Sequence, residues 1–291
     1  MQLNFTKMHG IGNDYIYVNC FEKCIEQPDR ISQYVSNRHK GVGSDGLILI
    51  SPSDIADCQM RIFNADGSEG NMCGNGIRCV AKYVYETGLV RKEQMQIETK
   101  SGIKQITLKV RDHIVEEVAV DMGMAKLKPA TIPVIDAVAE DECKNHPLQI
   151  DNAVYYITCV SMGNPHAVIF TEDVKQVDLL QLGPKFENNP IFPERVNTEF
   201  VHVEDAHSIY MRVWERGSGE TMACGTGACA SVVAAVLNGY CSKEEEITVH
   251  LLGGDLKIIY REDGRVIMRG TATRVFDGVI DINEEELKDA G

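Results

Sequence analysis

A duplicated glycine-rich motif is the feature that most constrains how this chain can fold. The first copy, S-E-G-N-M-C-G-N-G-I-R-C, carries Cys73, and the second, G-E-T-M-A-C-G-T-G-A-C-A, carries Cys224. Aligning the two cysteines also superposes the glycines of C-G-x-G and places Glu69 on Glu220, at an offset of 151 residues. Because this offset is about half of the 291 residues, we predict two structurally similar halves.

Each copy of the motif leads directly into a predicted amphipathic helix. Apolar residues recur at helical spacing and stop before a glycine suited to the C′ position: Ile77, Val80, Ala81 and Val84 before Gly88, and Ala228, Val232, Val233 and Val236 before Gly239. Both cysteines are therefore expected at or just before a helix N-terminus. Unpaired amides and the helix dipole favour a thiolate at that position.

The motif also predicts an anion site, because its glycines let backbone amides approach a carboxylate closely. Two thiols on opposite sides of one carbon can invert it, one removing a proton and the other delivering one. A single cysteine in a glycine-rich turn is more often structural, but the duplication favours a functional role. Cys79 and Cys229, which lie on the helices themselves, are predicted to be small buried apolar groups.

The rest of the chain reads as short strands with few helices. Two-residue turns are predicted at Ser101-Gly102 and Asp263-Gly264, so antiparallel sheet should dominate. A helix is expected after Pro28-Asp29 and a short one over 178–182. The proline-containing stretch 123–147 is the expected crossing between domains.

Composition excludes several classes of protein. A formal net charge of −14 argues against duplex nucleic acid or an anionic membrane as the main partner. The opening residues do not resemble a secretory signal, and no apolar run is long enough to cross a bilayer, so a cytoplasmic protein is expected. The ten cysteines should then be thiols, and the absence of any C-x-x-C pair argues against a zinc site.

Seven strings, in this order along nearly the whole chain, resemble the diaminopimelate epimerase family. They are K-M-H-G-I-G-N-D-Y at 7–15, G-V-G-S-D-G at 41–46, F-N-A-D-G-S-E at 63–69, M-C-G-N-G-I-R-C at 72–79, S-M-G-N-P-H at 161–166, P-E-R-V-N at 193–197 and W-E-R-G-S-G-E-T-M-A-C-G-T-G-A-C-A at 214–230.

The resemblance implies an α/β fold of two pseudo-symmetric domains. Each is a mostly antiparallel, barrel-like sheet around a central helix, and the active site lies in the interdomain cleft. The domains are expected at 1–122 plus 275–291, the Cys73 half, and at 123–274, the Cys224 half. A homodimer is also implied.

The resemblance further implies an isomerase that interconverts L,L- and meso-diaminopimelate, for lysine and peptidoglycan precursors, without pyridoxal phosphate, metal or any other cofactor. Cys73 and Cys224 match the two catalytic cysteines, and His166 and Glu215 match positions that tune the thiols. The residues that match the family's substrate-binding positions are Asn13, Asn64, Gly74, Asn75, Asn164, Asn197, Glu215, Arg216, Gly225 and Thr226.

Two positions depart from the pattern of some family members. Gly46 stands where some carry a substrate-contacting Gln, so a direct side-chain contact is lost there. Phe276 stands where some carry a Tyr linked to dimer contacts, which keeps the ring and removes the hydroxyl.

Three other functions are consistent with part of the sequence. A cofactor-independent racemase of another amino acid would use the same two thiols, but Arg216 and the asparagine set favour diaminopimelate. A thiol redox sensor would need no carboxylate-binding residues. A non-catalytic binding protein would bind diaminopimelate without exchanging its protons.

Overall fold

The computed structural model describes residues 1–135, 141–282 and 287. Its contacts divide the chain into two compact units, one of residues 1–120 with 270–291 and one of residues 121–269. The expected crossing segment, 123–147, includes residues 136–140, which lie outside the described part of the chain.

The first unit consists of a mainly antiparallel sheet and two helices. Its elements are β1 (Gln2–Gly10), β2 (Asn13–Asn19), α1 (Pro28–Ser36), β3 (Gly46–Ser51), β4 (Cys58–Asn64), β5 (Glu69–Gly70), α2 (Gly74–Glu86), β6 (Gln94–Thr99), β7 (Gly102–Arg111), β8 (Ile114–Met124), which ends in the second unit, and β18 (Thr273–Asp281). Strand β1 pairs antiparallel with both β2 and β18, and β2–β3 and β4–β6 are parallel.

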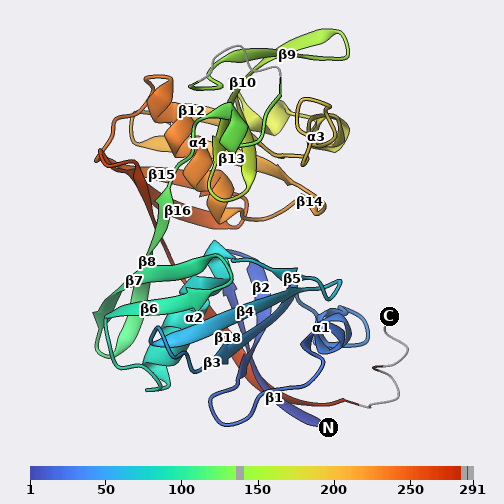
Figure 1. Ribbon diagram of the computed structural model, residues 1–291, viewed down its shortest axis with the longest axis vertical. Helices are drawn as coiled ribbons and strands as arrows, with labels where there is room; N and C mark the ends of the chain where they lie inside the picture. The colour runs from blue at the N-terminus through green and yellow to red at the C-terminus, as the bar shows by residue number, and fades with distance from the viewer. Residues whose placement is uncertain (136–140, 283–286, 288–291) are drawn as a thin grey trace. The chain divides into compact units, whose positions relative to one another are not determined.

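Helix α2 is the central helix of this unit and lies among its strands (Figure 1). Ile77, Val80 and Val84, which repeat at helical spacing, are completely buried, as is Cys79. The predicted apolar stripe therefore faces the sheet and holds the N-terminus of α2, with Cys73, in place.

The second unit has the same kind of architecture. Its elements are η1 (Pro129–Thr131), β9 (His146–Ile150), β10 (Ala153–Ser161), β11 (Pro165–Phe170), η2 (Val174–Gln176), α3 (Leu179–Glu187), β12 (Asn197–Asp205), β13 (Ser208–Glu215), β14 (Gly219–Glu220), α4 (Gly225–Leu237), β15 (Glu246–Leu251), β16 (Gly254–Tyr260) and β17 (Arg265–Gly270). Helix α4 lies among these strands (Figure 1), and Cys229 on it is completely buried.

The internal repeat extends far beyond the glycine-rich motif. Shifting β1, α1 and α2 by 151 residues gives the bounds of β10, α3 and α4. The two repeated glutamates also have equivalent partners, because Arg61 Nε donates to Glu69 and Arg212 Nε donates to Glu220, each over 2.8 Å. The predicted fold class, α/β with two pseudo-symmetric halves of mostly antiparallel sheet, is confirmed.

Local predictions from the sequence hold for most elements and need correction at four. Helix α4 was predicted to be amphipathic, but its residues 227–235 are all buried because strands surround it. Helix α1 begins at Pro28 as expected, but α3 continues past 182 and through Pro184 to Glu187. The first hairpin turns at Lys100-Ser101, because Thr99 pairs with Gly102. The second turn has three residues, 262–264, and Gly264 adopts the positive φ that such a turn requires.

Candidate active site

Both repeated cysteines are the N-cap residues of their helices. The Cys73 sulfur accepts a hydrogen bond from the amide of Gly76 at 3.3 Å, and the Cys224 sulfur accepts one from Gly227 at 3.4 Å. Each sulfur therefore occupies the place that a serine or aspartate oxygen takes in an ordinary cap. The predicted placement of both thiols at helix N-termini is confirmed.

The Cys73 sulfur is hydrogen-bonded to uncharged polar groups. The thiol donates to Asn13 Oδ1 at 3.3 Å, and the same oxygen accepts from Asn75 Nδ2 at 3.3 Å. Asn13 in turn donates to Asp45 at 2.8 Å, which fixes its orientation. The structure thus brings three predicted site residues, Cys73, Asn13 and Asn75, into contact.

Tyr15 completes this group and explains the departure at Gly46. The Tyr15 hydroxyl interacts with both Asn13 and Cys73, and burial, with the Cys73 and Asp45 charges adding to it, raises the pKa of this phenol well above its usual range. A Cβ atom on Gly46 would lie 2.2 Å from the Phe63 carbonyl oxygen and 2.9 Å from the Tyr15 ring. A Gln side chain therefore does not fit this backbone.

A buried guanidinium group lies at the start of the same helix. Arg78 is completely buried, and it donates to the carbonyls of Gly74 and Thr271, each over 3.2 Å. A Cβ on Gly10 would approach the Arg78 Nη2 atom to 2.9 Å, so glycine leaves the space that this side chain occupies.

Acidic groups lie around Cys224. Burial raises the pKa of this thiol well above its usual range, and the charges of Glu215 and Glu199 raise it further. Burial also raises the pKa of Glu215, while hydrogen bonds from Thr221 and Cys224 lower it. The Thr226 hydroxyl lies 3.5 Å from the sulfur. Cys224 is therefore held as a thiol beside a carboxylate.

A buried histidine–glutamate pair connects to Cys224 through two further side chains. His166 and Glu199 are both completely buried, and His166 Nδ1 lies 2.7 Å from Glu199 Oε1. The other ring nitrogen, Nε2, lies 3.0 Å from Asn164 Oδ1, and Asn164 Nδ2 donates to Thr226 at 3.3 Å. Predicted residues His166, Asn164 and Thr226 thus form one chain with Cys224.

The remaining predicted side chains contact backbone or turn groups. Asn197 donates to the Pro165 carbonyl and accepts from the Arg216 amide, each over 2.9 Å. The Arg216 guanidinium donates to the Glu194 carbonyl at 2.8 Å. Asn64 donates to Ser68 in the turn after β4. Gly74 and Gly225 begin the first turns of α2 and α4.

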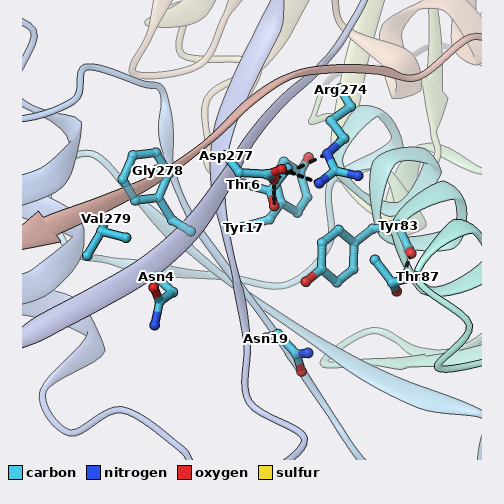
Figure 2. A pocket seen from close by; sticks show the side chains of 11 residues that line it. Asn4, Thr6, Tyr17, Asn19, Tyr83, Thr87, Arg274, Asp277, Gly278 and Val279 are labelled. Carbon is cyan, nitrogen blue, oxygen red and sulfur yellow. Dashed lines mark hydrogen bonds and ion pairs between the residues drawn. The ribbon is translucent and has the colours of Figure 1, made fainter.

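A cavity of about 500 Å³ lies elsewhere on the first unit and is lined by none of the predicted site residues. Figure 2 shows that Asp277 on β18 joins Thr6 and Arg274 there; Thr6 Oγ1 donates to Asp277 at 2.6 Å. Among the described residues, no group of three or more His, Cys, Asp or Glu is arranged to hold a metal ion. Nor does the described part contain a helix long and apolar enough to span a membrane.

Sequence reasoning missed Tyr15, Arg78 and Glu199. Tyr15 and Arg78 lie inside motifs that carry the family resemblance, but nothing in the local pattern marks them as neighbours of Cys73. Glu199 had a readable signal, since an acidic residue stands between the apolar residues of a buried strand, N-T-E-F-V. Such a residue is rarely buried without a partner.

The fold places the chain in a known structural class. It superposes on a probable proline racemase from Agrobacterium radiobacter K84 with a TM-score of 0.72 at 14% identity, covering 97% of this chain and 93% of the other. It superposes on a phenazine biosynthesis protein of the PhzF family from Bacillus anthracis with a TM-score of 0.69 at 19% identity, covering 97% and 100%.

Sequence similarity identifies the family within that class. The family model for diaminopimelate epimerase matches residues 5–128 and 158–275. A diaminopimelate epimerase from Acetivibrio thermocellus is 53% identical, covering 97% of this chain and all of its own length. One from Bacillus cytotoxicus is 51% identical over 98% of this chain and 99% of its own. The chain belongs to the diaminopimelate epimerase family and is an isomerase that acts on a small molecule.

Proposed function

We propose that this chain interconverts L,L- and meso-diaminopimelate, for lysine and peptidoglycan precursors, by proton transfer between its two N-cap cysteines and the substrate α-carbon. The observation that carries the proposal is that a cysteine is the N-cap residue of the central helix in both units. In each case the sulfur accepts a hydrogen bond from a backbone amide in the first turn of the helix. Full-length relatives that are more than half identical carry the diaminopimelate epimerase name.

The two thiols have opposite tasks in each turnover. Because burial and Glu215 hold Cys224 as a thiol, we assign Cys224 as the acid and Cys73, once it is deprotonated, as the base. The Cys73 thiolate takes the α-proton, the carbon passes through a carbanion, and Cys224 gives its proton to the opposite face. The products are the inverted carbon, a Cys73 thiol and a Cys224 thiolate, so the reverse reaction starts from exchanged roles.

The helix N-termini stabilise the substrate carboxylate and the developing charge. The first turns of α2 and α4 offer the amides of Gly74, Asn75, Gly225 and Thr226, at the positive ends of the helix dipoles. These preorganised donors replace the electron sink that a cofactor would supply. The side chains we assign to substrate binding are Asn13, Asn64, Asn164, Asn197, Glu215 and Arg216.

Hydrogen exchange in D₂O tests this function. Freshly reduced protein is incubated with L,L-diaminopimelate, meso-diaminopimelate and a panel of single-centre amino acids, and products are analysed by NMR and chiral chromatography. We expect deuterium to enter only the diaminopimelates while L,L and meso interconvert. Exchange in another amino acid alone would make the chain a racemase of that substrate, and no exchange would favour a binding or redox protein.

We also infer a cytoplasmic homodimer that uses the outer face of β18. Val275, Phe276 and Val279 on this strand are exposed, and the Phe276 ring packs edge-on against Phe5 with centroids 5.8 Å apart. Such a run of exposed apolar side chains is typical of a protein interface. In sedimentation velocity, wild-type protein should be dimeric and Val279→Asp monomeric. A monomeric wild type would refute the dimer.

A further inference from the structure

Glu199 is a buried acidic residue whose equivalent position in the first unit holds an apolar side chain. In the first unit, 151 residues earlier, this position is Ile48. A Cβ on Gly76 would lie 2.6 Å from Ile48 Cδ1, and a Cβ on the equivalent Gly227 would lie 2.7 Å from Glu199 Oε1. Both side chains are completely buried against the start of the central helix. Because burying a carboxylate is costly, its presence here calls for a function.

The hydrogen bonds around Glu199 define a direction. Asn164 donates its amide hydrogen to Thr226, so its oxygen faces His166 Nε2 and accepts there. Nδ1 of the same ring faces the Glu199 carboxylate at 2.7 Å. Both ring nitrogens therefore face acceptors, and the ring satisfies both contacts when it carries two protons. Thr226, which accepts from Asn164, keeps its own hydrogen for the Cys224 sulfur 3.5 Å away.

We propose that Glu199 is a positioning residue for Cys224: its carboxylate holds His166 doubly protonated and so fixes the direction of the hydrogen-bonded chain through Asn164 and Thr226 to the sulfur. This inference rests on the proposed role of Cys224 as an acid and base. It assigns Glu199 a task in the reaction although the side chain lies too deep to touch substrate.

The charges that act on Glu199 come from four elements. They are His166 on β11, Cys224 at the start of α4, Glu215 on β13 and Cys159 on β10. The imidazolium offsets part of the Glu199 charge, and Glu215 is the larger of the two carboxylate charges that raise the pKa of Cys224. The Glu199 carboxylate therefore lets His166 orient the chain while it opposes the imidazolium charge, which by itself would lower the pKa of Cys224.

Two variants test this role, and the first introduces the side chain that the other unit has at the equivalent position. Glu199→Ile copies the side chain at Ile48, and Glu199→Gln keeps the shape of glutamate without its charge. Nitrogen-15 NMR of the imidazoles, with His166 assigned by its loss in His166→Asn, should show both ring nitrogens protonated in wild type at neutral pH. In both variants one proton should be lost there. A neutral His166 ring in wild type, or identical spectra in the variants, would overturn the proposal.

Kinetics provide the second readout. Both variants should lower kcat about tenfold or more, as expected when a buried carboxylate that orients an imidazole is removed, with KM changing less than kcat. Glu187→Gln is the matched control, since Glu187 is a buried carboxylate of the same unit that accepts from Trp214 and Gly217. It should leave the His166 signals unchanged. Equal kcat in wild type and both Glu199 variants would contradict the role.

The spectroscopic result does not depend on turnover. If wild-type protein exchanges no proton in any diaminopimelate, the proposed function fails while the His166 spectrum still decides whether Glu199 sets the ring's protonation. If the enzyme epimerises diaminopimelate and His166 is neutral, the proposed function stands and the Glu199 proposal fails.

Discussion

The Cys73 unit and the Cys224 unit share a backbone frame but differ in the charge around the sulfur. Both cysteines cap a buried helix, and both caps are followed by glycines at equivalent positions. Around Cys73 the structure places the amide of Asn13 and the phenol of Tyr15. Around Cys224 it places the carboxylates of Glu215 and Glu199.

This difference in charge arises from residues that differ between equivalent positions of the repeat. At an offset of 151 residues Tyr15 becomes His166, and Ile48 becomes Glu199. Both kinds of side chain occur in one frame, because the central helices have equivalent bounds and the strands that carry these positions begin within one residue of equivalence. A duplicated frame can therefore place two identical thiols in different electrostatic surroundings, which lets one serve as acid while the other serves as base.

Removing either thiol should have the largest effect. Cys73→Ala and Cys224→Ala should each lower epimerisation by about 10²- to 10⁴-fold or more, since each removes the acid or base on one face of the carbon. Cys24→Ser, at an exposed cysteine, serves as the control and should retain full activity in the same chiral assay. Wild-type turnover in either alanine variant would refute the two-base mechanism.

Removing the Glu215 charge should make the surroundings of Cys224 more like those of Cys73. The Glu215 carboxylate raises the pKa of Cys224, so Glu215→Gln should lower it and move Cys224 alkylation to lower pH. A change of one unit gives about a tenfold faster rate at fixed pH. The difference from wild type should vanish in acid, where Glu215 itself is protonated. An unchanged alkylation profile would mean that the Glu215 charge does not set the pKa of this thiol.

Gly46 tests the first unit's close packing. Gly46→Ala should lower the free energy of unfolding by about 1–3 kcal/mol, because the new Cβ would overlap the Phe63 carbonyl. At the equivalent position of the second unit, Asn197→Ala adds no atoms and only removes its two hydrogen bonds to backbone. Urea unfolding followed by circular dichroism measures both. A neutral Gly46→Ala would show that the backbone there can move aside.

The Tyr15→Phe substitution should have the smallest effect of the four sets of variants. Tyr15→Phe keeps the ring against Gly46 and removes one hydroxyl from the Cys73 sulfur, a loss of about 1 kcal/mol for a single hydrogen bond. We expect a several-fold slower alkylation of Cys73 at fixed pH and no change at Cys224. Tyr83→Phe, at a partly buried tyrosine near the C-terminal end of α2, is the control. Equal rates in wild type and Tyr15→Phe would remove Tyr15 from the site.

The sequence predicted the elements whose signals are local. The apolar spacing and glycine stops of α2 and α4, and the start of α1 at Pro28, need only a few neighbouring residues to be recognised. The end of α3 was missed because Leu179 and Phe186 pack into the core and carry the helix through Pro184. The turn residues of both hairpins shifted because strand register is set by pairing across the sheet.

The residues of the candidate site also divide into those that the sequence predicted and those that it did not. The cysteines stand in strings that recur within the chain, so sequence comparison of its halves found them. Glu199 and Tyr15 act through contacts with residues distant along the chain, and their equivalents in the other half, Ile48 and His166, are chemically different. A search for similarity between the halves therefore passes over them, whereas the contacts of Tyr15 with Cys73 and of Glu199 with His166 reveal them in the structure.

Site-resolved alkylation of the wild-type enzyme tests the central claim most directly. Iodoacetamide is applied across a pH series to reduced protein, and peptide mass spectrometry measures the rate at each cysteine separately. Because each site is compared with its own maximum, the pH of half-maximal rate is independent of how exposed the sulfur is. We predict that Cys73 reaches half its maximal rate at a clearly lower pH than Cys224. Equal midpoints, or a lower one for Cys224, would contradict the account.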